Sequence, residues 1–489
     1  MARPGEVRFE SSAGRWVLAA TVLGSGVASL DATVVNLALP RLASDLDADF
    51  AGLQWVITSY TLSLASLILL GGALGDRFGR RRIFAIGLAW FAGASLLCAL
   101  APTIAVLTGA RLLQGVGGAL LVPGSLAIIS ASFHPADRSR AIGAWSGLGG
   151  VTMAVGPFLG GWIVAASWRW IFLLNLPLVA AVLAISFRHV PESRDPEAAG
   201  PIDAVGALVG AAGLAATTFA LIAQDPRIGL AGLLLLGAFV GVELREHHPM
   251  LPMAVFRNRQ FSAANAVTLV VYGALSMVMF LAGLVLQTAL GYTPLQAGAS
   301  LLPVTVIMLV LSARSGGLAS RIGPRLQMSV GPVVVAAGIA LMVRIAPGVD
   351  YVTGVLPAVV VFGLGLAATV APLTSTVLAA ADERHAGVAS GVNNAVARTA
   401  GLLAVAAVPL ITGFDPNASI GAGALVDGFH RAAWVGAGAC VLGGGLSALL
   451  ISNDVLRAGP PTGAPPDTEG AVPCFHCGVD ATPLVTDTA

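Results

Sequence analysis

Three charged side chains interrupt long apolar stretches of this sequence: Asp31, Arg111 and Arg398. A charge inside an apolar segment is costly and usually faces a cavity or a partner charge. Burial disfavours the charged form of a carboxyl group, whereas a nearby guanidinium favours it. We therefore expect Asp31 to take up and release a proton as its hydration or its distance from Arg111 changes. The structural alternative is an ion pair that only locks two helices together.

The composition indicates what kind of protein must position these charges. Hydrophobic residues make up 56% of the chain, charged residues 10%, and the mean hydropathy is +0.86. Ordinary globular domains are about 45–50% apolar and about 25% charged, so we expect an integral membrane protein. All 26 basic residues are arginine, which excludes catalytic and nucleotide-binding lysines. We expect no enzyme activity, cofactor or metal, and a net charge of +1 predicts no nucleic-acid binding.

Apolar segments long enough to cross a bilayer, about 20 residues each, recur along the chain. We expect fourteen spanning helices, near 15–38, 53–73, 83–101, 104–130, 141–165, 169–188, 203–223, 228–244, 262–289, 297–314, 327–346, 353–380, 388–413 and 430–452.

The arginines predict the orientation of these spans. Five fall on one side of the membrane: Arg41, Arg169, Arg227, Arg344 and Arg431. Two more, Arg111 and Arg398, lie inside spans, and the other nineteen fall on the opposite side. Because cytoplasmic loops are enriched in arginine, both termini are expected in the cytoplasm of a cell whose plasma membrane holds the protein.

Two loops recur at one spacing. Residues 72–82 and 316–325 are similar at an offset of 244, and the same offset relates 140–147 to 384–391. This indicates two repeated halves with an insertion between them. The expected organisation is an N-terminal segment (1–14), a six-helix bundle (15–188), two inserted helices with linkers (189–261), a second six-helix bundle (262–452) and a disordered tail (453–489).

At this point the chain resembles the major facilitator superfamily, and within it the fourteen-span drug:proton antiporter family. The resemblance covers nearly the whole chain up to about residue 455. Four stretches carry it: Gly72–Arg82, Leu30–Pro40, Arg111–Gly118 and Gly147–Gly161. It implies an all-α fold and a proton-coupled antiporter that exports amphipathic small molecules by alternating access. It also implies that the spans at 15–38 and 104–130 line a central cavity. We expect the protein to be a monomer.

Candidate residues for proton coupling and substrate binding follow. Asp31 lies about 24 Å along the first span, and Arg111 about 10 Å below the outer end of the fourth, so their depths are similar. We expect these two to couple the proton. The residues expected to contact substrate are Asp31, Asn36, Gln114, Tyr272, Phe280, Gln287, Asn394 and Arg398.

Two further sets are candidates for gating. In the loop after the second span these are Gly72, Asp76, Arg77, Gly79 and Arg80. The resemblance implies that Asp76 latches onto 387–391 in the outward-open state, whereas a topogenic positive cluster is the alternative. In the fifth span they are Gly156, Pro157, Gly160 and Gly161, which either pack helices or also seal the cavity.

Two other functions compete with export. One is facilitated or proton-coupled uptake of a small metabolite, against which the antiporter-like stretch 147–161 stands. The other is a membrane enzyme or receptor, for which no catalytic motif is visible. The tail carries Cys474, His476 and Cys477, too few ligands for a closed zinc site. Substrate identity, proton stoichiometry, conformational state and oligomeric state do not follow from the sequence.

Overall fold

The computed structural model describes residues 5, 7–195, 203–247, 249–381 and 386–456. Residues 457–489, with Cys474, His476 and Cys477, lie outside the described part, as do several side chains of the helix that contains Pro157. The described residues fold almost entirely into helices, apart from loops and one isolated β-bridge between Val7 and Phe133.

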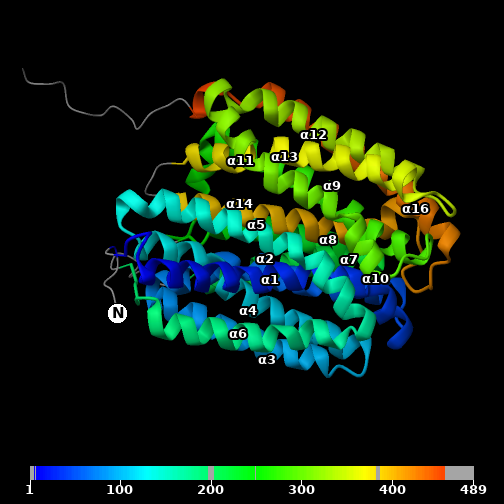
Figure 1. Ribbon diagram of the computed structural model, residues 1–489, viewed down its shortest axis with the longest axis horizontal. Coiled ribbons are helices and arrows are strands. Elements are labelled where there is room, and N and C mark those ends of the chain that lie inside the picture. Colours follow the sequence, from blue (N-terminus) through cyan, green and yellow to red (C-terminus); the bar gives the residue numbers. More distant parts are fainter. Residues whose placement is uncertain (1–4, 6, 196–202, 248, 382–385, 457–489) are drawn as a thin grey trace, which may run out of the picture.

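The first six long helices form one bundle (Figure 1). They are α1 (Ser12–Asp45), α2 (Phe50–Phe78), α3 (Arg80–Ala99), α4 (Ile104–Ser132), α5 (Pro135–Ala166) and α6 (Arg169–His189). Short polar turns end them, and the side chains of Ser11, Asp49 and Thr103 each accept a hydrogen bond from the first turn of the helix that follows.

The second bundle is built from the later helices. These are α9 (Arg259–Thr288), α10 (Pro294–Ser300), α11 (Leu302–Ile322), α12 (Pro324–Leu341), α13 (Leu356–Ala379), α14 (Ala386–Ala406), α15 (Val408–Thr412) and α16 (Ala422–Leu450). Four short helical turns accompany them: η1 (Met253–Arg257), η2 (Met342–Arg344), η3 (Tyr351–Val355) and η5 (Asn453–Leu456). The last falls where the sequence predicts the start of the tail.

Two expected spans are interrupted. The segment at 297–314 divides into α10 and α11 at Leu301, and the segment at 388–413 divides into α14 and α15 at Ala407. In each case a proline, Pro303 or Pro409, stands in the first turn after the break. Proline has no N–H to donate back along the helix, so it starts a new helix more readily than it continues one.

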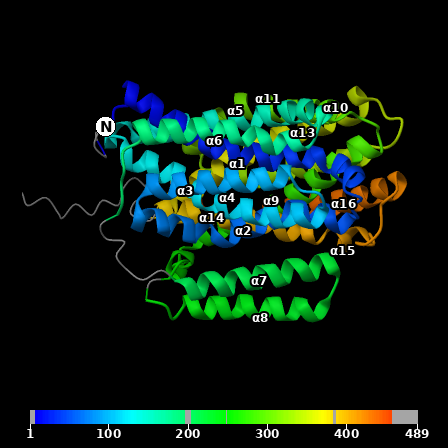
Figure 2. The ribbon, with the colours of Figure 1, turned by 90° about the horizontal axis from the view of Figure 1, so that it is seen from below.

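The two inserted helices form a separate hairpin. Figure 2 shows α7 (Ala204–Ala223) and α8 (Pro226–Glu243) side by side and outside the main body. Of the two, α7 faces the bundles and packs against α2 and α14. The rings of Trp55 and Phe219 are 6.1 Å apart at this contact.

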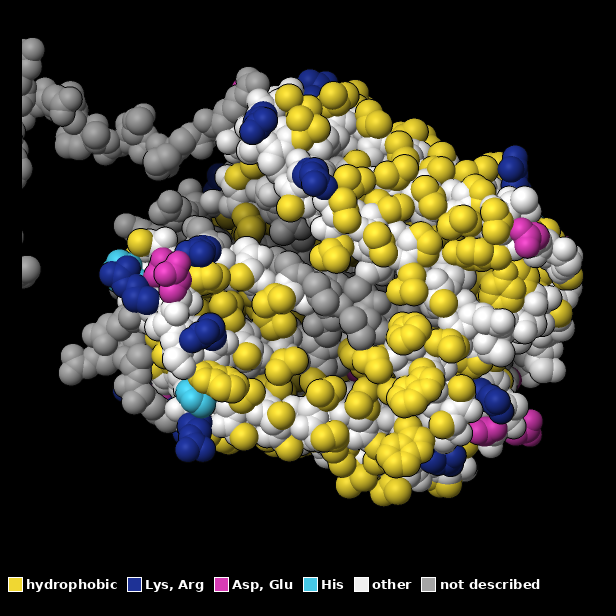
Figure 3. Space-filling view, viewed as in Figure 1, with side chains coloured by type: hydrophobic (Ala, Val, Ile, Leu, Met, Phe, Trp, Pro, Cys, Tyr) yellow, Lys and Arg dark blue, Asp and Glu magenta, His cyan; other side chains and the backbone are white. Residues whose placement is uncertain are grey.

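Twelve helices of the described chain are long and apolar enough to cross a membrane. They do not include α5 or α14. Large apolar side chains such as Trp162, Leu208 and Leu449 are exposed. Figure 3 shows hydrophobic side chains over most of the visible face, with the charged ones gathered towards its two ends. This distribution matches a surface surrounded by lipid.

Apolar packing differs between the two ends of the molecule. We call the end where both described chain ends lie the terminal end, and the opposite end, with loops 46–49, 289–293 and 413–421, the far end (Figure 1). At the far end both bundles share one apolar cluster, which includes Leu37, Phe50, Phe280 and Phe429. Towards the terminal end the buried residues form a separate cluster in each bundle, with Ala395 of α14 packed against the first and Leu69 of α2 against the second. The bundles are therefore joined at the far end.

Candidate functional site

Asp31 lies in α1 and Arg111 in α4, and their side chains form an ion pair. The carboxylate is 0% and the guanidinium 1% exposed, so the pair is sealed from lipid and from water. Burying two charges is costly unless their geometry is good and other hydrogen bonds satisfy them.

Side chains from three helices supply those hydrogen bonds. Gln114, one turn after Arg111, donates from Nε2 to Asp31 Oδ1 at 2.9 Å and accepts at Oε1 from Arg111 at 2.6 Å. Asn175 of α6 donates from Nδ2 to the same carboxylate oxygen at 3.1 Å. Ser95 of α3 accepts from both amides, at 2.9 and 3.2 Å. The carboxylate thus has three donors around it, a set that stabilises its charged form.

Aromatic and backbone groups hold the guanidinium. Arg111 donates from Nε to the carbonyl oxygen of Val56 in α2 at 3.1 Å. Its guanidinium carbon lies 4.4 Å from the ring centroid of Tyr60 and 5.8 Å from that of Phe172. Such contacts favour a cation where water is absent.

Glycines of the stretch 111–118 explain why α4 reaches this position. A Cβ on Gly117 would lie 2.8 Å from the backbone nitrogen of Phe91 in α3, and one on Gly118 3.1 Å from the Tyr60 hydroxyl in α2. Only glycine allows α4 to fit so closely between its neighbours. This close packing places Arg111 and Gln114 against Asp31.

Sequence reasoning placed Asp31 and Arg111 at similar depth, and the structure brings them into contact together with Gln114. It missed Asn175, Ser95 and Tyr60. The sequence marks these three residues only as polar residues inside otherwise apolar segments. Many residues that have no role in the network have the same feature. Because Asp31 faces the interior of its own bundle, a substrate between the bundles does not touch it in this conformation.

Arg398 lies apart from this network, in the middle of α14, and is half-buried. Within the described part of the chain it forms no ion pair. It stands on α14 between two contacts with α2 of the first bundle, that of Gly391 with Leu69 and that of Val405 with Gln54. It therefore lies where the two bundles face each other.

The other expected substrate contacts are spread over several sites. Gln287 donates to the carbonyl oxygen of Leu37 at 3.0 Å, and Phe280 packs at 6.0 Å against the ring of Phe50, so both join the bundles at the far end. Asn36 lies beside them with a buried side-chain oxygen that has no partner among the described residues. Asn394 is exposed.

The loop after α2 contacts the segment that follows α6. Asp76 pairs with Arg80 at 2.8 Å, and its carbonyl oxygen accepts from Asp195 N at 2.9 Å. Gly79 has a positive φ of 109°, and a Cβ there would lie 2.8 Å from Glu192 Oε1. The bonds found for Asp76 do not include the expected latch with 387–391, and residues 382–385 beside that stretch lie outside the described part.

Glycines of α5 face two neighbours. A Cβ on Gly160 would lie 2.6 Å from Val34 of α1, and one on Gly161 2.6 Å from the Leu295 Cα of α10. Gly156 faces Thr33 at a wider 3.6 Å. The α5 helix thus packs closely against its own bundle and, through Gly161, against the other one.

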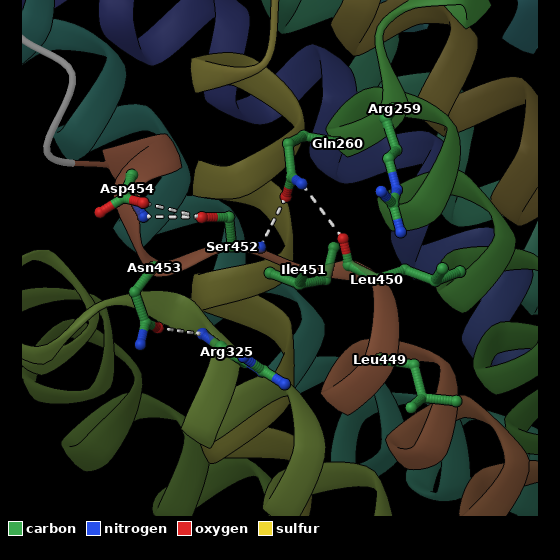
Figure 4. A pocket seen from close by; sticks show the side chains of 9 residues that line it. All are labelled: Arg259, Gln260, Arg325, Leu449, Leu450, Ile451, Ser452, Asn453 and Asp454. Carbon is green, nitrogen blue, oxygen red and sulfur yellow. Dashed lines mark hydrogen bonds between the residues drawn. The ribbon is translucent and has the colours of Figure 1, made fainter.

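A polar pocket at the terminal end is separate from these groups (Figure 4). Gln260 accepts from Ser452 N at 2.8 Å and donates to the carbonyl oxygen of Leu450 at 3.1 Å, while Arg325 N donates to Asn453 at 3.2 Å. These bonds fix the chain after α16 to α9 and α12. No candidate substrate or proton residue lines this pocket.

Solved structures share the fold. An inward-facing bacterial homolog of the human lysosomal transporter Spinster has a TM-score of 0.62 at 15% identity, covering 92% of this chain and 98% of its own. A peptide transporter POT bound to sulfate has a TM-score of 0.64 at 16% identity, covering 92% and 97%. At such identities the likeness concerns the fold.

Sequence comparisons give closer relatives. The Methylenomycin A resistance protein of Bacillus subtilis is 35% identical over 84% of this chain and 91% of its own length. The Puromycin resistance protein pur8 of Streptomyces alboniger is 37% identical over 80% of each chain. The Multidrug resistance protein Stp of Mycobacterium tuberculosis is 35% identical over 77% of this chain and 72% of its own. The model of the Major Facilitator Superfamily matches residues 21–406. With two helical bundles, a fold shared with known transporters and a match over most of its length, this multi-pass membrane protein belongs to the major facilitator superfamily, as its motifs predicted.

Proposed function

We propose that this protein is a proton-coupled antiporter that exports amphipathic small molecules, such as drugs, dyes or antibiotics, across the plasma membrane. Asp31 takes up and releases the proton, and Arg111 controls its charge. The observation that carries the proposal is the sealed ion pair between α1 and α4 with its amide donors. Its relatives, named for resistance to antibiotics and to multiple drugs, support the substrate class.

The network makes the charge of Asp31 depend on the helix arrangement. Its buried carboxylate is tolerated only while Arg111, Gln114 and Asn175 keep their donors in place. A shift of α4 or α6 that withdraws these donors makes protonation favourable. Proton uptake is thereby linked to the arrangement of the helices.

The substrate acts on this network from outside it. Asp31 is sealed, but Tyr60 of α2 lies over Arg111 and stands at the level of Arg398, since Gln54 and Leu69 on either side of it contact Val405 and Gly391 of α14. Substrate contacts come from residues that face the other bundle, with Tyr272, Asn36 and Asn394 as candidates. Binding of substrate and binding of the proton then oppose each other through movements of α2 and α4, although the two do not bind to the same atom.

Alternating access requires the bundles to open at one end of the molecule while they are joined at the other. The excess of arginine in the loops at the terminal end supports a cytoplasmic position for that end. We infer that the joined far end marks an inward-facing state, in which cargo enters from the cytoplasm. Rocking of the bundles opens the far end, and the Asp76 loop then latches onto α14. The glycines of α5 close the far end again. Adding α5 and α14 to the twelve candidate spans gives a fourteen-span monomer.

The proposal is tested in an efflux-deficient bacterial host and in proteoliposomes. We expect the wild type to protect the host from members of a panel of amphipathic drugs and dyes of either charge, and Asp31→Asn to give no protection. Purified wild-type protein should release protons when a substrate from this panel is added, since substrate and proton exclude each other. Uptake by a uniporter would release none.

A matched control is Asp47→Asn. Asp47 is exposed in the turn after α1 with a φ of 48°, a conformation that asparagine tolerates well. This variant should protect like the wild type. Full protection by a well-expressed Asp31→Asn variant would remove Asp31 from the coupling mechanism.

A further inference from the structure

Arg398 carries a positive charge that the described protein does not balance. Asp31 is already paired with Arg111, in the interior of the first bundle. The other described acidic side chains lie in loops or near helix ends, as Asp45, Asp427 and Glu243 do. Arg398 is thus a half-buried cation at mid-depth with no described counter-charge. Such a group is costly in a membrane unless it has an anion or a water-filled space beside it.

The face of α14 that carries Arg398 is turned towards the first bundle. Seven residues after Arg398, the backbone carbonyl oxygen of Val405 accepts a hydrogen bond from Gln54 Nε2 of α2 at 2.6 Å. Seven residues before it, a Cβ on Gly391 would lie 3.4 Å from the side chain of Leu69 of α2. Residues seven apart share one face of a helix. The adjacent face binds α9, where Asn393 donates to Asn265 and Thr268 at 3.1 and 2.9 Å.

The depth of Arg398 is that at which the apolar cluster shared by both bundles ends. The buried members of the cluster around Val392, before it, all come from the second bundle, although Leu69 of α2 packs against them, whereas Val405, after it, belongs to the shared cluster. Arg398 therefore lies just below the joined far end, at the level where the two bundles begin to have separate buried cores. A molecule that entered between the bundles from the terminal end would meet it.

Two tyrosines stand at the level of Arg398. Tyr272 of α9 lies between the contacts of Thr268 with Asn393 and of Ser276 with Gly401, and Tyr60 of α2 lies between the contacts of Gln54 with Val405 and of Leu69 with Gly391. Tyr272 of α9 is half-buried, and no hydrogen bond of its hydroxyl is found among the described residues. Tyr60 of α2 is buried, with its ring against Arg111. A guanidinium with a tyrosine hydroxyl nearby offers donors suited to a carboxylate or another delocalised organic anion.

We propose that Arg398 and Tyr272 form the subsite for an acidic group of the substrate, so that the exported compounds are amphipathic organic anions. This rests on the proposed export function and names its substrate class. The acidic group of the substrate binds Arg398, and the apolar part of the substrate lies against the surrounding helices. Tyr60, whose ring packs against Arg111, then lies between the bound acidic group and the Arg111–Asp31 pair.

The proposal is tested by binding to purified protein in detergent, which needs no proton gradient. The probes are 1-pyrenebutyric acid and 2-naphthoic acid, each compared with its methyl ester. We expect the wild type to bind the acids about tenfold or more tightly than the esters, because a charge-assisted hydrogen bond is lost in each ester. Arg398→Gln should lose this preference, and Arg398→Lys should keep part of it.

Controls separate the subsite from other effects of charge. Arg314→Gln removes one exposed arginine whose guanidinium bonds only to the carbonyl of Val310 among the bonds found, and should bind like the wild type. Equal binding of acids and esters by the wild type overturns the proposal, as does an Arg398→Gln variant that keeps the preference. Displacement of the acids by equimolar phosphate would mark an inorganic-ion site and also overturn it. Failure of the Asp31→Asn test alone leaves this binding result intact, so the two proposals fail separately.

Discussion

Arg111 makes bonds that no other side chain reproduces. Its Nε donates to Val56, one terminal nitrogen serves both Asp31 and Gln114, and the flat guanidinium lies under the Tyr60 ring. Lysine has one ammonium group and no planar surface, so it cannot satisfy these partners together. The residue therefore acts as a structural centre for α1, α2 and α4 as well as a charge.

This predicts strong coupling between Arg111 and Asp31 in stability. Arg111→Met should sharply lower the thermal unfolding midpoint in detergent, because breaking a buried pair costs about 3–5 kcal/mol. Asp31→Asn combined with Arg111→Met should recover much of that loss, since no buried charge is left alone. The exposed Arg227→Met is the matched control and should unfold like the wild type. Additive losses in the double variant would contradict the coupling.

At the scale of elements, glycines decide how closely helices approach. Gly161 lets α5 pack on the backbone of α10, across the boundary between the bundles, so that contact belongs to the far-end-joined state. Gly93 of α3 has nothing within 4 Å of the position its Cβ would take. The two positions therefore separate a packing effect from a general effect of replacing glycine in a helix.

We expect Gly161→Ala to weaken the joined far end. Its Cβ would clash with Leu295, and overpacking costs about 1–3 kcal/mol, enough to shift a balance between two conformations. The measurement is the distance distribution between spin labels at positions 47 and 417, in loops of the far end. Longer distances should grow in Gly161→Ala and not in Gly93→Ala. An unchanged distribution in both variants would show that this contact does not hold the far end together.

The elements could be predicted from the sequence to a large degree, and their contacts could not. Apolar length gives the helices, and the repeated loops give two halves with α7 and α8 between them. The breaks at Leu301 and Ala407 escape hydropathy because both flanks are apolar. The contact of Asn175 with Asp31 depends on how α1 and α6 are rotated about their axes, and a nearly uniform apolar sequence specifies this weakly.

At the scale of the whole molecule, the joined far end is held by a small set of contacts between the bundles. Ala51 N donates to the carbonyl oxygen of Pro416 at 2.9 Å, beside the contacts of Phe50 with Phe280 and Phe414. These two chain segments must separate if cargo leaves at this end. A covalent link between these two segments should therefore stop transport after the substrate has bound.

We predict that a disulfide between Ala51→Cys and Pro416→Cys abolishes transport while acid binding persists, because the bundles stay open towards the terminal end. A reducing agent should restore transport. The native Cys98 and Cys440 are buried, and Cys474 and Cys477 are replaced by serine in all samples. Each single cysteine variant, oxidised in the same way, is the control. Full transport by the cross-linked protein would exclude release at the far end.

The α7–α8 hairpin touches both bundles, since α7 packs on α2 of the first and on α14 of the second. It cannot keep both contacts unchanged in the rocking motion that we propose. An antibody fragment that grips α7 together with either partner would therefore brake the transporter from its flank, without occupying the path of cargo or of protons. Because such an inhibitor does not touch the residues that contact the drug, mutations of those residues would not make the transporter resistant to it.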